Sequence, residues 1–314
     1  MYEELLALDP VRINFSASGM NIINIILSFI MFGVALDIKT GVLLQIFRQP
    51  KSYLIGLISQ LVALPLVTFL LIILLGNNIT PTMAMGMILV ASCPGGNISN
   101  FISSLSKANT ELSVGLTATT TLLATITTPF NFAFWGGLYV NYTSKHASHV
   151  LQPLIIDNAQ MFETVFILLG IPLILGIVCA KYLTMLTQML RKPIQILSIV
   201  FFVAMIVLAF ANNFNLFLKY IYFVFAIVFI HNFLALFTGF GLATLFKLPH
   251  ADRRSITIET GIQNSGLGLV LLFNPKIFPP NLALGGMLFI TAWWGVWHIV
   301  SGLSLAAYWH RKQC

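Results

Sequence analysis

The sequence predicts an all-α integral membrane protein in which two of the membrane-spanning helices are broken. Of the 314 residues, 58% are hydrophobic and 8% are charged, and the mean hydropathy is +0.93. Such a chain has too few polar groups to cover a water-soluble surface. Its long apolar runs, separated by short polar turns, indicate several membrane spans. Polar residues and glycines interrupt two of these runs, at 92–100 and 258–266.

Nine apolar runs have the length of about 17–25 residues that a spanning helix needs. We expect nine transmembrane helices at 19–38, 52–75, 82–106, 110–140, 154–182, 193–211, 219–246, 253–274 and 281–309. Turn residues and helix breakers separate them at 76–78, 107–109, 191–193, 212–213 and 249–252. The chain then divides into a tail (1–18), a first repeat (19–140), a loop (141–153), a second repeat (154–309) and a second tail (310–314).

The basic residues predict how the chain is oriented in the membrane. With nine spans the two termini lie on opposite sides, and twelve of the sixteen Lys and Arg residues fall on the side of the C-terminus. Cytoplasmic loops are enriched in basic residues. We therefore expect residues 310–314 in the cytoplasm, and residues 1–18 and 141–153 outside a plasma or inner membrane. The net charge of +7 is scattered along the chain, which argues against a nucleic-acid partner.

The two interruptions have the composition of unwound helix. In the first, Pro94 lacks a backbone donor, and Gly95 and Gly96 tolerate non-helical angles. The second relies on Gly261 and Gly266. In the predicted orientation the two broken spans are antiparallel, as in inverted-repeat transporters, and the first repeat lacks its first helix. Unwound backbone is tolerated at this depth when it is buried in protein or lines a cavity, so we expect the breaks to cross near the midplane.

Glu259 is the acid that the pattern places deep inside a span. A charge there costs about 2.5–3.5 kcal/mol on insertion scales and normally marks an ion or substrate path. No Lys or Arg lies deep inside another predicted span to pair with it, since Lys181 and Lys219 are at span ends. Ser113 and Thr117 share a helix face at i and i+4, and their oxygens suit a hard cation such as sodium. For each Ser or Thr, and for Gln60, packing between helices is the alternative interpretation. For His298 the alternative is a core histidine with satisfied hydrogen bonds.

These motifs resemble the bile acid:sodium symporter family. The resemblance covers the chain from residue 19 onward and rests on Cys93–Asn100, Glu111–Thr117 and Glu259–Asn264, with Met31–Gly33, His231–Asn232 and Trp297–His298 in support. It implies sodium-coupled import of an organic anion by alternating access, in a protein split into a core and a panel domain. Many bacterial members begin with an extra helix, so this chain is more similar to the nine-helix members.

The resemblance also implies two co-transported sodium ions and the residues that hold them. The first sodium site would use Ser99, Asn100, Ser113, Thr117 and Glu259. The second would use the side chains of Gln60, Gln263 and Glu259 with the backbone carbonyls of Thr260 and Ile262. The substrate would meet Asn97, Asn264 and His298. Bacterial members tend to carry Thr where Asn97 stands, so the resemblance defines the sodium ligands better than the substrate.

Several alternatives stay open at this point. A proton gradient could replace sodium, because one buried acid can carry protons. A receptor is a different class, which two interrupted helices do not suit. The sequence offers no activated nucleophile with a base in an assignable geometry, so we expect no enzyme. The organic anion could be an amphipathic acid similar to a bile acid, or a small hydroxy acid such as pantoate. We expect the chain to function as a monomer in the lipid bilayer.

Overall fold

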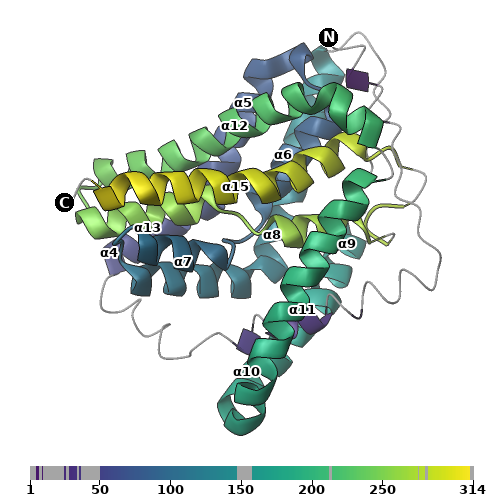
Figure 1. Ribbon diagram of the computed structural model, residues 1–314. Coiled ribbons are helices and arrows are strands. Elements are labelled where there is room, and N and C mark those ends of the chain that lie inside the picture. Colours follow the sequence, from purple (N-terminus) through teal and green to yellow (C-terminus); the bar gives the residue numbers. More distant parts are fainter. Residues whose placement is uncertain are drawn as a thin grey trace.

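The computed structural model describes most of the chain, and helices joined by short non-helical segments make up the described part (Figure 1). The described residues are 50–146, 158–211, 214–274, 276–279 and 282–311, with Leu5, Leu6, Asp9, Ile25, 28–33 and 35–36. The predicted span 19–38 lies largely outside them. The all-α prediction is confirmed for the described residues, whereas the count of nine spans and the inverted repeat stay predictions.

The helices follow one another through short turns. They are α4 (Pro50–Ile58), η3 (Ser59–Ala63), α5 (Leu64–Leu75), η4 (Gly76–Asn78), α6 (Pro81–Ser92), α7 (Ile98–Leu105), α8 (Thr110–His146), α9 (Asn158–Val165), η5 (Phe166–Gly170), α10 (Ile171–Tyr182), α11 (Thr184–Ala211), α12 (Phe214–Leu245), α13 (His250–Gly261), α14 (Ser265–Leu272) and α15 (Gly285–Arg311). In Figure 1, α10 and α11 project from the rest of the molecule.

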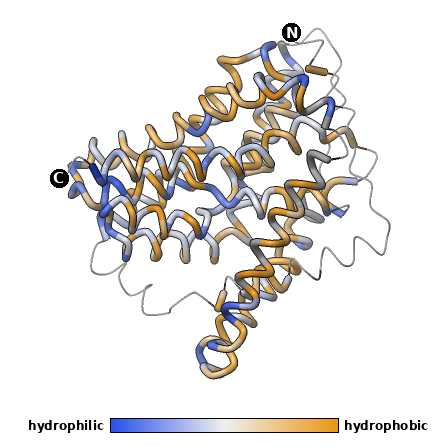
Figure 2. Tube along the Cα trace, viewed as in Figure 1, coloured by the Kyte–Doolittle hydropathy of each residue, from blue (hydrophilic) through white to orange (hydrophobic). Residues whose placement is uncertain are grey.

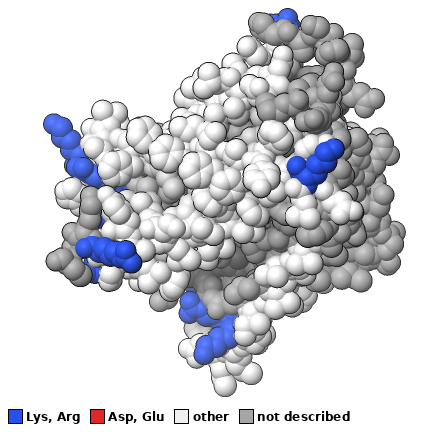
Figure 3. All heavy atoms as spheres, turned by 45° about the horizontal axis from the view of Figure 1, so that its top comes forward, with Lys and Arg blue, Asp and Glu red and all other residues white. Residues whose placement is uncertain are grey.

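Four helical stretches are long and apolar enough to cross a membrane. They are Pro50–Asn78, Phe162–Tyr182, Leu218–Leu245 and Gly285–Arg311. Large apolar side chains such as Leu74, Phe233 and Phe237 are exposed, as lipid contact requires. Apolar residues cover most of the helical length in Figure 2, and on the face in Figure 3 the Lys and Arg side chains stand in separate groups away from its centre. The chain is therefore a multi-pass membrane protein.

Two predicted turns are wrong. Residues 191–193 lie inside α11, because Pro193 removes one intrahelical hydrogen bond without ending the helix. The chain turns instead at Leu183, between α10 and α11. The polar segment 249–252 is also not a loop along its whole length, since α13 begins at His250. Asp252 therefore lies in the first helical turn and is buried.

The two predicted breaks are confirmed. Helix α6 ends at Ser92 and α7 begins at Ile98, whereas α13 ends at Gly261 and α14 begins at Ser265. The unwound segments pair with each other. The Gly96 amide donates to the Ile262 carbonyl (2.9 Å), and the Asn264 amide donates to the Pro94 carbonyl (2.8 Å). A single antiparallel bridge joins Gly95 to Gln263 between these bonds. Each break thus supplies the hydrogen-bond partners that the other lacks.

Two spans contain a π-helical turn. The first, η3, separates α4 from α5 and carries Gln60, and the second, η5, separates α9 from α10. A proline follows each turn, Pro65 after η3 and Pro172 after η5. Turns of this kind occur mostly as short insertions in α-helices and are frequent at functional sites. The first of them brings Gln60 toward the second break, as described below.

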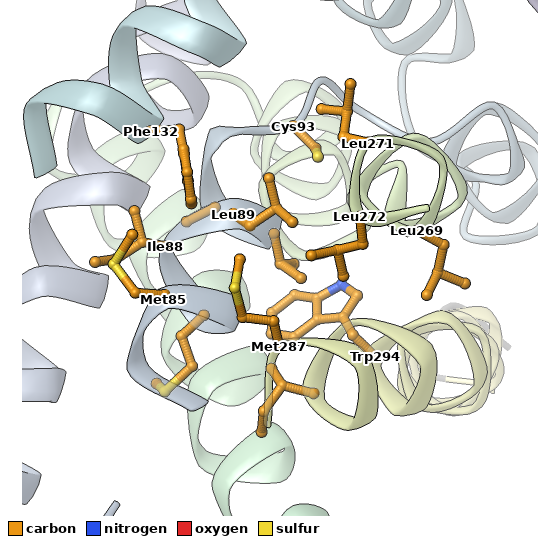
Figure 4. Packing of buried hydrophobic residues seen from close by; sticks show 14 of the residues in the cluster. Met85, Ile88, Leu89, Cys93, Phe132, Leu269, Leu271, Leu272, Met287 and Trp294 are labelled. Carbon is orange, nitrogen blue, oxygen red and sulfur yellow. The ribbon is translucent and has the colours of Figure 1, made fainter. Parts of the chain in front are cut away.

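The core lies where α6 packs against α14 and α15. Figure 4 shows Leu89 of α6 and Leu272 of α14 close to Met287 and Trp294 of α15. All four side chains are buried, and Trp294 is fully so. Helix α6 approaches α15 closely at Gly86, where an added Cβ would lie 2.8 Å from the Met287 Cα atom.

Asp9 ties the N-terminal segment to the same pair of helices. Its Oδ1 accepts hydrogen bonds from the hydroxyls of Thr80 (2.7 Å) and Thr82 (2.5 Å) at the start of α6. The Thr82 hydroxyl oxygen in turn accepts from the Gly286 amide in the first turn of α15 (3.0 Å). Burial raises the pKa of Asp9, and the hydroxyls of Thr82 and Thr80 lower it in part. A carboxylate beside two helix N-termini is favourably placed against the helix dipoles.

The close approach of α6 to α15 generates a stability prediction. We expect Gly86→Ala to destabilise the protein by about 1–3 kcal/mol, because the new methyl group meets backbone that cannot rotate away. Gly137→Ala is the matched control, since nothing lies within 4 Å of a Cβ at that position. The measurement is the Tm of each purified variant in detergent. Equal Tm values for the two variants would contradict the packing described for α6.

Candidate functional site

Glu259 is buried at the centre of a cluster of hydroxyl groups. It lies in the last turn of α13, and 1% of its surface is exposed. Its Oε1 accepts hydrogen bonds from Ser99 of α7 and from Ser113 of α8 (2.5 Å). Thr117 of α8 donates to the same carboxylate, 3.0 Å from Oε1 and 2.9 Å from Oε2. These partners are all neutral, so hydrogen bonds rather than a basic side chain stabilise the carboxylate.

This cluster has more acceptor oxygens than protons. The Asn100 carbonyl oxygen lies 3.0 Å from the Ser113 hydroxyl and 3.2 Å from the Thr117 hydroxyl, so it shares these donors with Glu259. A hydroxyl has one proton, whereas each carboxylate or carboxamide oxygen can accept two hydrogen bonds. Oxygen-rich sites of this kind are typical of hard cations. The five residues predicted for the first sodium site are thus brought together.

Two of the residues predicted for the second site, Gln60 and Glu259, lie beside Gly95. A Cβ at Gly95 would lie 2.7 Å from Glu259 Oε2 and 2.9 Å from Gln60 Nε2. Gln60 also lies within 3.5 Å of the side-chain oxygen of Gln263. The side-chain oxygen of Gln60 (Oε1) is buried and has no hydrogen-bond partner. The first break therefore passes between two polar groups, and a side chain at Gly95 would force at least one of them to move.

The two backbone carbonyls predicted as ligands already accept internal hydrogen bonds. The Thr260 carbonyl accepts from the Gln263 side chain (2.8 Å), and the Ile262 carbonyl accepts from the Gly96 amide (2.9 Å). A carbonyl oxygen has two lone pairs, so one remains for a further interaction. Both residues are fully buried beside the second break.

The three residues predicted to meet the substrate have different surroundings. Asn97 is exposed at the N-terminal end of α7. Asn264 is half-buried and caps α14, with its side-chain oxygen accepting from the Leu267 amide (3.0 Å). His298 of α15 is buried, and its Nδ1 has no hydrogen-bond partner. No hydrogen bond joins His298 to either asparagine in the described part of the chain.

Two residues near the breaks were not assigned a place in the site by the sequence. Ser59 lies beside Gln60, and its hydroxyl is 2.7 Å from that of Thr260. Asn232 of α12 donates to the Gly261 carbonyl (2.7 Å) and accepts from Ser301 of α15 (2.6 Å). Asn232 thus holds the last carbonyl of α13 in place. Its position as a polar residue inside an apolar span is the signal that the sequence offered.

Comparison with known proteins places this arrangement in a family. The model of the Sodium Bile acid symporter family matches residues 24–220. This match covers more than half of the chain, and the family is one of sodium symporters. The protein is therefore a membrane transporter and not an enzyme. It belongs to the sodium bile acid symporter family, which confirms the resemblance seen in the sequence.

Similar proteins occur in bacteria, plants and animals. The chain is 31% identical over 92% of its length to the "Uncharacterized sodium-dependent transporter YocS" of Bacillus subtilis, and spans 83% of that protein. It is 29% identical over 78% of its length to the "Probable sodium/metabolite cotransporter BASS1, chloroplastic" of rice. It is 27% identical over 86% of its length to the human "Sodium/bile acid cotransporter 4". The chain spans 56% of the rice protein and 59% of the human one.

The contact around Gly95 generates a binding prediction. We expect Gly95→Ala to weaken sodium binding by about tenfold, because its methyl group would push Glu259 and Gln60 apart. Gly241→Ala is the control, since a Cβ there meets nothing within 4 Å. Sodium titration of both purified variants is the measurement. An unchanged sodium affinity in Gly95→Ala would show that no ion lies between these two side chains.

Proposed function

We propose that this protein is a symporter that uses two sodium ions to import an organic anion. The observation that carries the proposal is the cluster around Glu259, where the buried carboxylate and the Asn100 side-chain oxygen share the same few hydroxyl protons. A buried charge without a basic partner is costly, and a bound cation removes that cost. The names of the relatives in Bacillus subtilis and humans, which mention sodium, support the same ion.

The two proposed sodium sites share Glu259. The first is formed by oxygens of Ser99, Asn100, Ser113 and Thr117 on one side of the carboxylate. The second is formed by Gln60 and Gln263, with the carbonyls of Thr260 and Ile262. Two cations that share one carboxylate repel each other. Because an anionic substrate nearby offsets this repulsion, we expect both sodium sites to be filled only when the substrate is bound.

The helix ends at the crossing supply complementary partial charges. Helices α6 and α13 end at the breaks, so the carbonyls of their C-terminal turns lie at the crossing. Helices α7 and α14 begin after the breaks, so the amides of their N-terminal turns lie there too. C-terminal ends favour cations and N-terminal ends favour anions. Asn97 and Asn264 stand at these two N-terminal ends, so we infer that they meet the carboxylate of the substrate. His298 is proposed as a third substrate contact from α15.

The same proposal covers the substrate, the membrane and the transport cycle. The carried anion is a bile-acid-like amphipathic acid or a small hydroxy acid such as pantoate. The protein works as a monomer in a plasma or inner membrane, with the N-terminus outside and the C-terminus in the cytoplasm. Alternating access arises from movement of a core against a panel domain. Proton coupling is the competing mechanism, and uptake into proteoliposomes, described below, separates the two.

Neutralising Glu259 tests the proposed coupling. We expect Glu259→Gln to weaken sodium binding by about ten- to a hundredfold, because the loss of a charge-assisted contact costs about 1.5–3 kcal/mol. Substrate binding should then lose its dependence on sodium, since coupling between two ligands is reciprocal. The measurement is sodium-titrated substrate binding to purified protein. Glu163→Gln is the matched control, because Glu163 is exposed in α9.

Two results would contradict this proposal. A wild-type sodium dependence in Glu259→Gln would remove Glu259 from both sites. Uptake into proteoliposomes that follows a proton gradient and ignores a sodium gradient would replace sodium coupling by proton coupling.

The substrate contact of Asn264 can be separated from its role as a helix cap. We expect Asn264→Ser to weaken substrate binding by about tenfold while sodium affinity stays unchanged, because Ser keeps the capping oxygen and removes the amide. Asn264→Ala should lose the cap as well and lower the Tm. Equal loss of sodium affinity in Asn264→Ser would show that the sodium and substrate sites were wrongly separated.

The proposed orientation predicts which side of the membrane each loop faces. A Cys replacing Lys107, between α7 and α8, should react with a membrane-impermeant thiol reagent from the cytoplasmic side only. A Cys replacing Lys145, near the end of α8, should react only from outside. Labelling of position 107 in intact cells would reverse the orientation.

A further inference from the structure

A polar stripe continues from Glu259 along α13 to the start of that helix. Asp252, Ser255 and Glu259 are spaced at i, i+3 and i+7, so they lie on one face. All three are buried, with exposed fractions of 5%, 0% and 1%. Seven residues of helix span about 10 Å. The stripe therefore leads from the sodium cluster to the end of α13 that the proposed orientation puts at the cytoplasm.

Helix α8 presents a matching stripe to α13. Asn109, just before α8, and Ser113 and Thr117 within it are spaced at i, i+4 and i+8. At the end near Glu259, Ser113 and Thr117 contact its carboxylate, as described above. At the end near Asp252, the Asn109 carbonyl accepts from Ser255 (2.7 Å), and the Asn109 side-chain amide donates to Asp252 Oδ1 (2.8 Å). The two stripes are thus joined by hydrogen bonds at both ends.

Helix α7 contributes a hydroxyl whose hydrogen bonding is unsatisfied. Ser103 follows Ser99 by four residues, so it lies one turn further along the same face of α7. Its side chain is fully buried, and its hydroxyl has no hydrogen-bond partner. A buried hydroxyl without a partner costs about 1–3 kcal/mol. The Ser106 hydroxyl, by contrast, bonds to the Ile102 carbonyl of its own helix (2.7 Å).

The end of the stripe furthest from Glu259 is formed by Asp252, a second carboxylate whose hydrogen-bond partners are neutral. Besides Asn109, Asp252 accepts from the Ser52 hydroxyl of α4 (2.6 Å). Arg254 is close in sequence but lies two residues from Asp252, on another face of α13. Its guanidinium donates to the Ser106 carbonyl (2.9 Å) and lies over the Trp309 ring at 5.5 Å. Arg254 therefore closes the end of α7, and the stripe ends at Asp252.

We propose that these stripes form the route by which sodium leaves Glu259 for the cytoplasm, with Ser103 and Ser255 as intermediate ligands and Asp252, Ser52 and Asn109 as a transient cation site at its end. This inference rests on the proposed function. Hydroxyl, carbonyl and carboxylate oxygens at spacings of about one helical turn suit a small hard cation that exchanges ligands stepwise. Two carboxylates repel an organic anion, so the substrate must leave by another path.

The route predicts slower sodium release at unchanged equilibrium affinity. We expect Asp252→Asn to slow the release of bound sodium by about tenfold and Ser103→Ala by about threefold, because each raises a barrier outside the sites where sodium is held. Ser106→Ala should release sodium at the wild-type rate. The measurement uses the purified full chain loaded with radioactive sodium, with release followed after dilution and affinity measured by titration.

The variants separate a route from a structural role. Ser103→Ala removes no hydrogen bond, so it decides the question even where Asp252→Asn fails to fold. A wild-type release rate in Ser103→Ala, or a loss of equilibrium affinity without a change of rate, would overturn the route. Glu259→Gln is measured beside them. If it loses sodium binding while Ser103→Ala releases sodium at the wild-type rate, the route fails and the proposed function stands; if wild type binds no sodium, both fail.

Discussion

The hydrogen bonds between the two unwound segments are the constraint on which the rest of the structure depends. A peptide group buried without a partner costs about 1–3 kcal/mol, and a membrane offers no water to replace the missing partner. Gly96 and Asn264 donate to carbonyls of the opposite break, so each segment is stable because the other is present. The absence of a side chain at Gly95 and Gly96 allows this approach. A single interrupted helix would lack these partners.

The crossing also explains why one carboxylate can occupy the protein interior. Ending α13 at Gly261 places Glu259 in a last helical turn, where the chain next to it no longer follows the helix. Asn232 and Ser59 then hold this end of α13 from α12 and from η3. Helices α7 and α8 bring the hydroxyls that hydrogen-bond to the carboxylate. The site is therefore assembled from elements that lie far apart along the chain, and the paired breaks position all of them.

The sequence predicted the parts of this arrangement that are encoded locally. Apolar runs and their interruptions identified the breaks at Pro94 and Gly261, and Glu259 as the buried acid. The oxygen ligands proposed for sodium were taken from the family resemblance. The burial of Asp252 could not be foreseen, because a polar residue after Pro249 has the pattern of a turn and only its contacts with Ser52 and Asn109 show otherwise. The turn at Leu183 was missed for a similar reason, since the charged residues before Pro193 are typical of a loop.

The π-helical turn at Ser59–Ala63 has a consequence for comparing this span with its relatives. Such a turn holds one more residue than an α-helical turn, and each residue of an α-helix rotates the chain by about 100°. The additional residue therefore rotates the helix from Leu64 to Leu75 about its axis, and this rotation decides which of its residues face the lipid. A homologue with an uninterrupted α-helix here would need a one-residue gap in the alignment. An ungapped alignment would equate inward-facing positions of one protein with lipid-facing positions of the other.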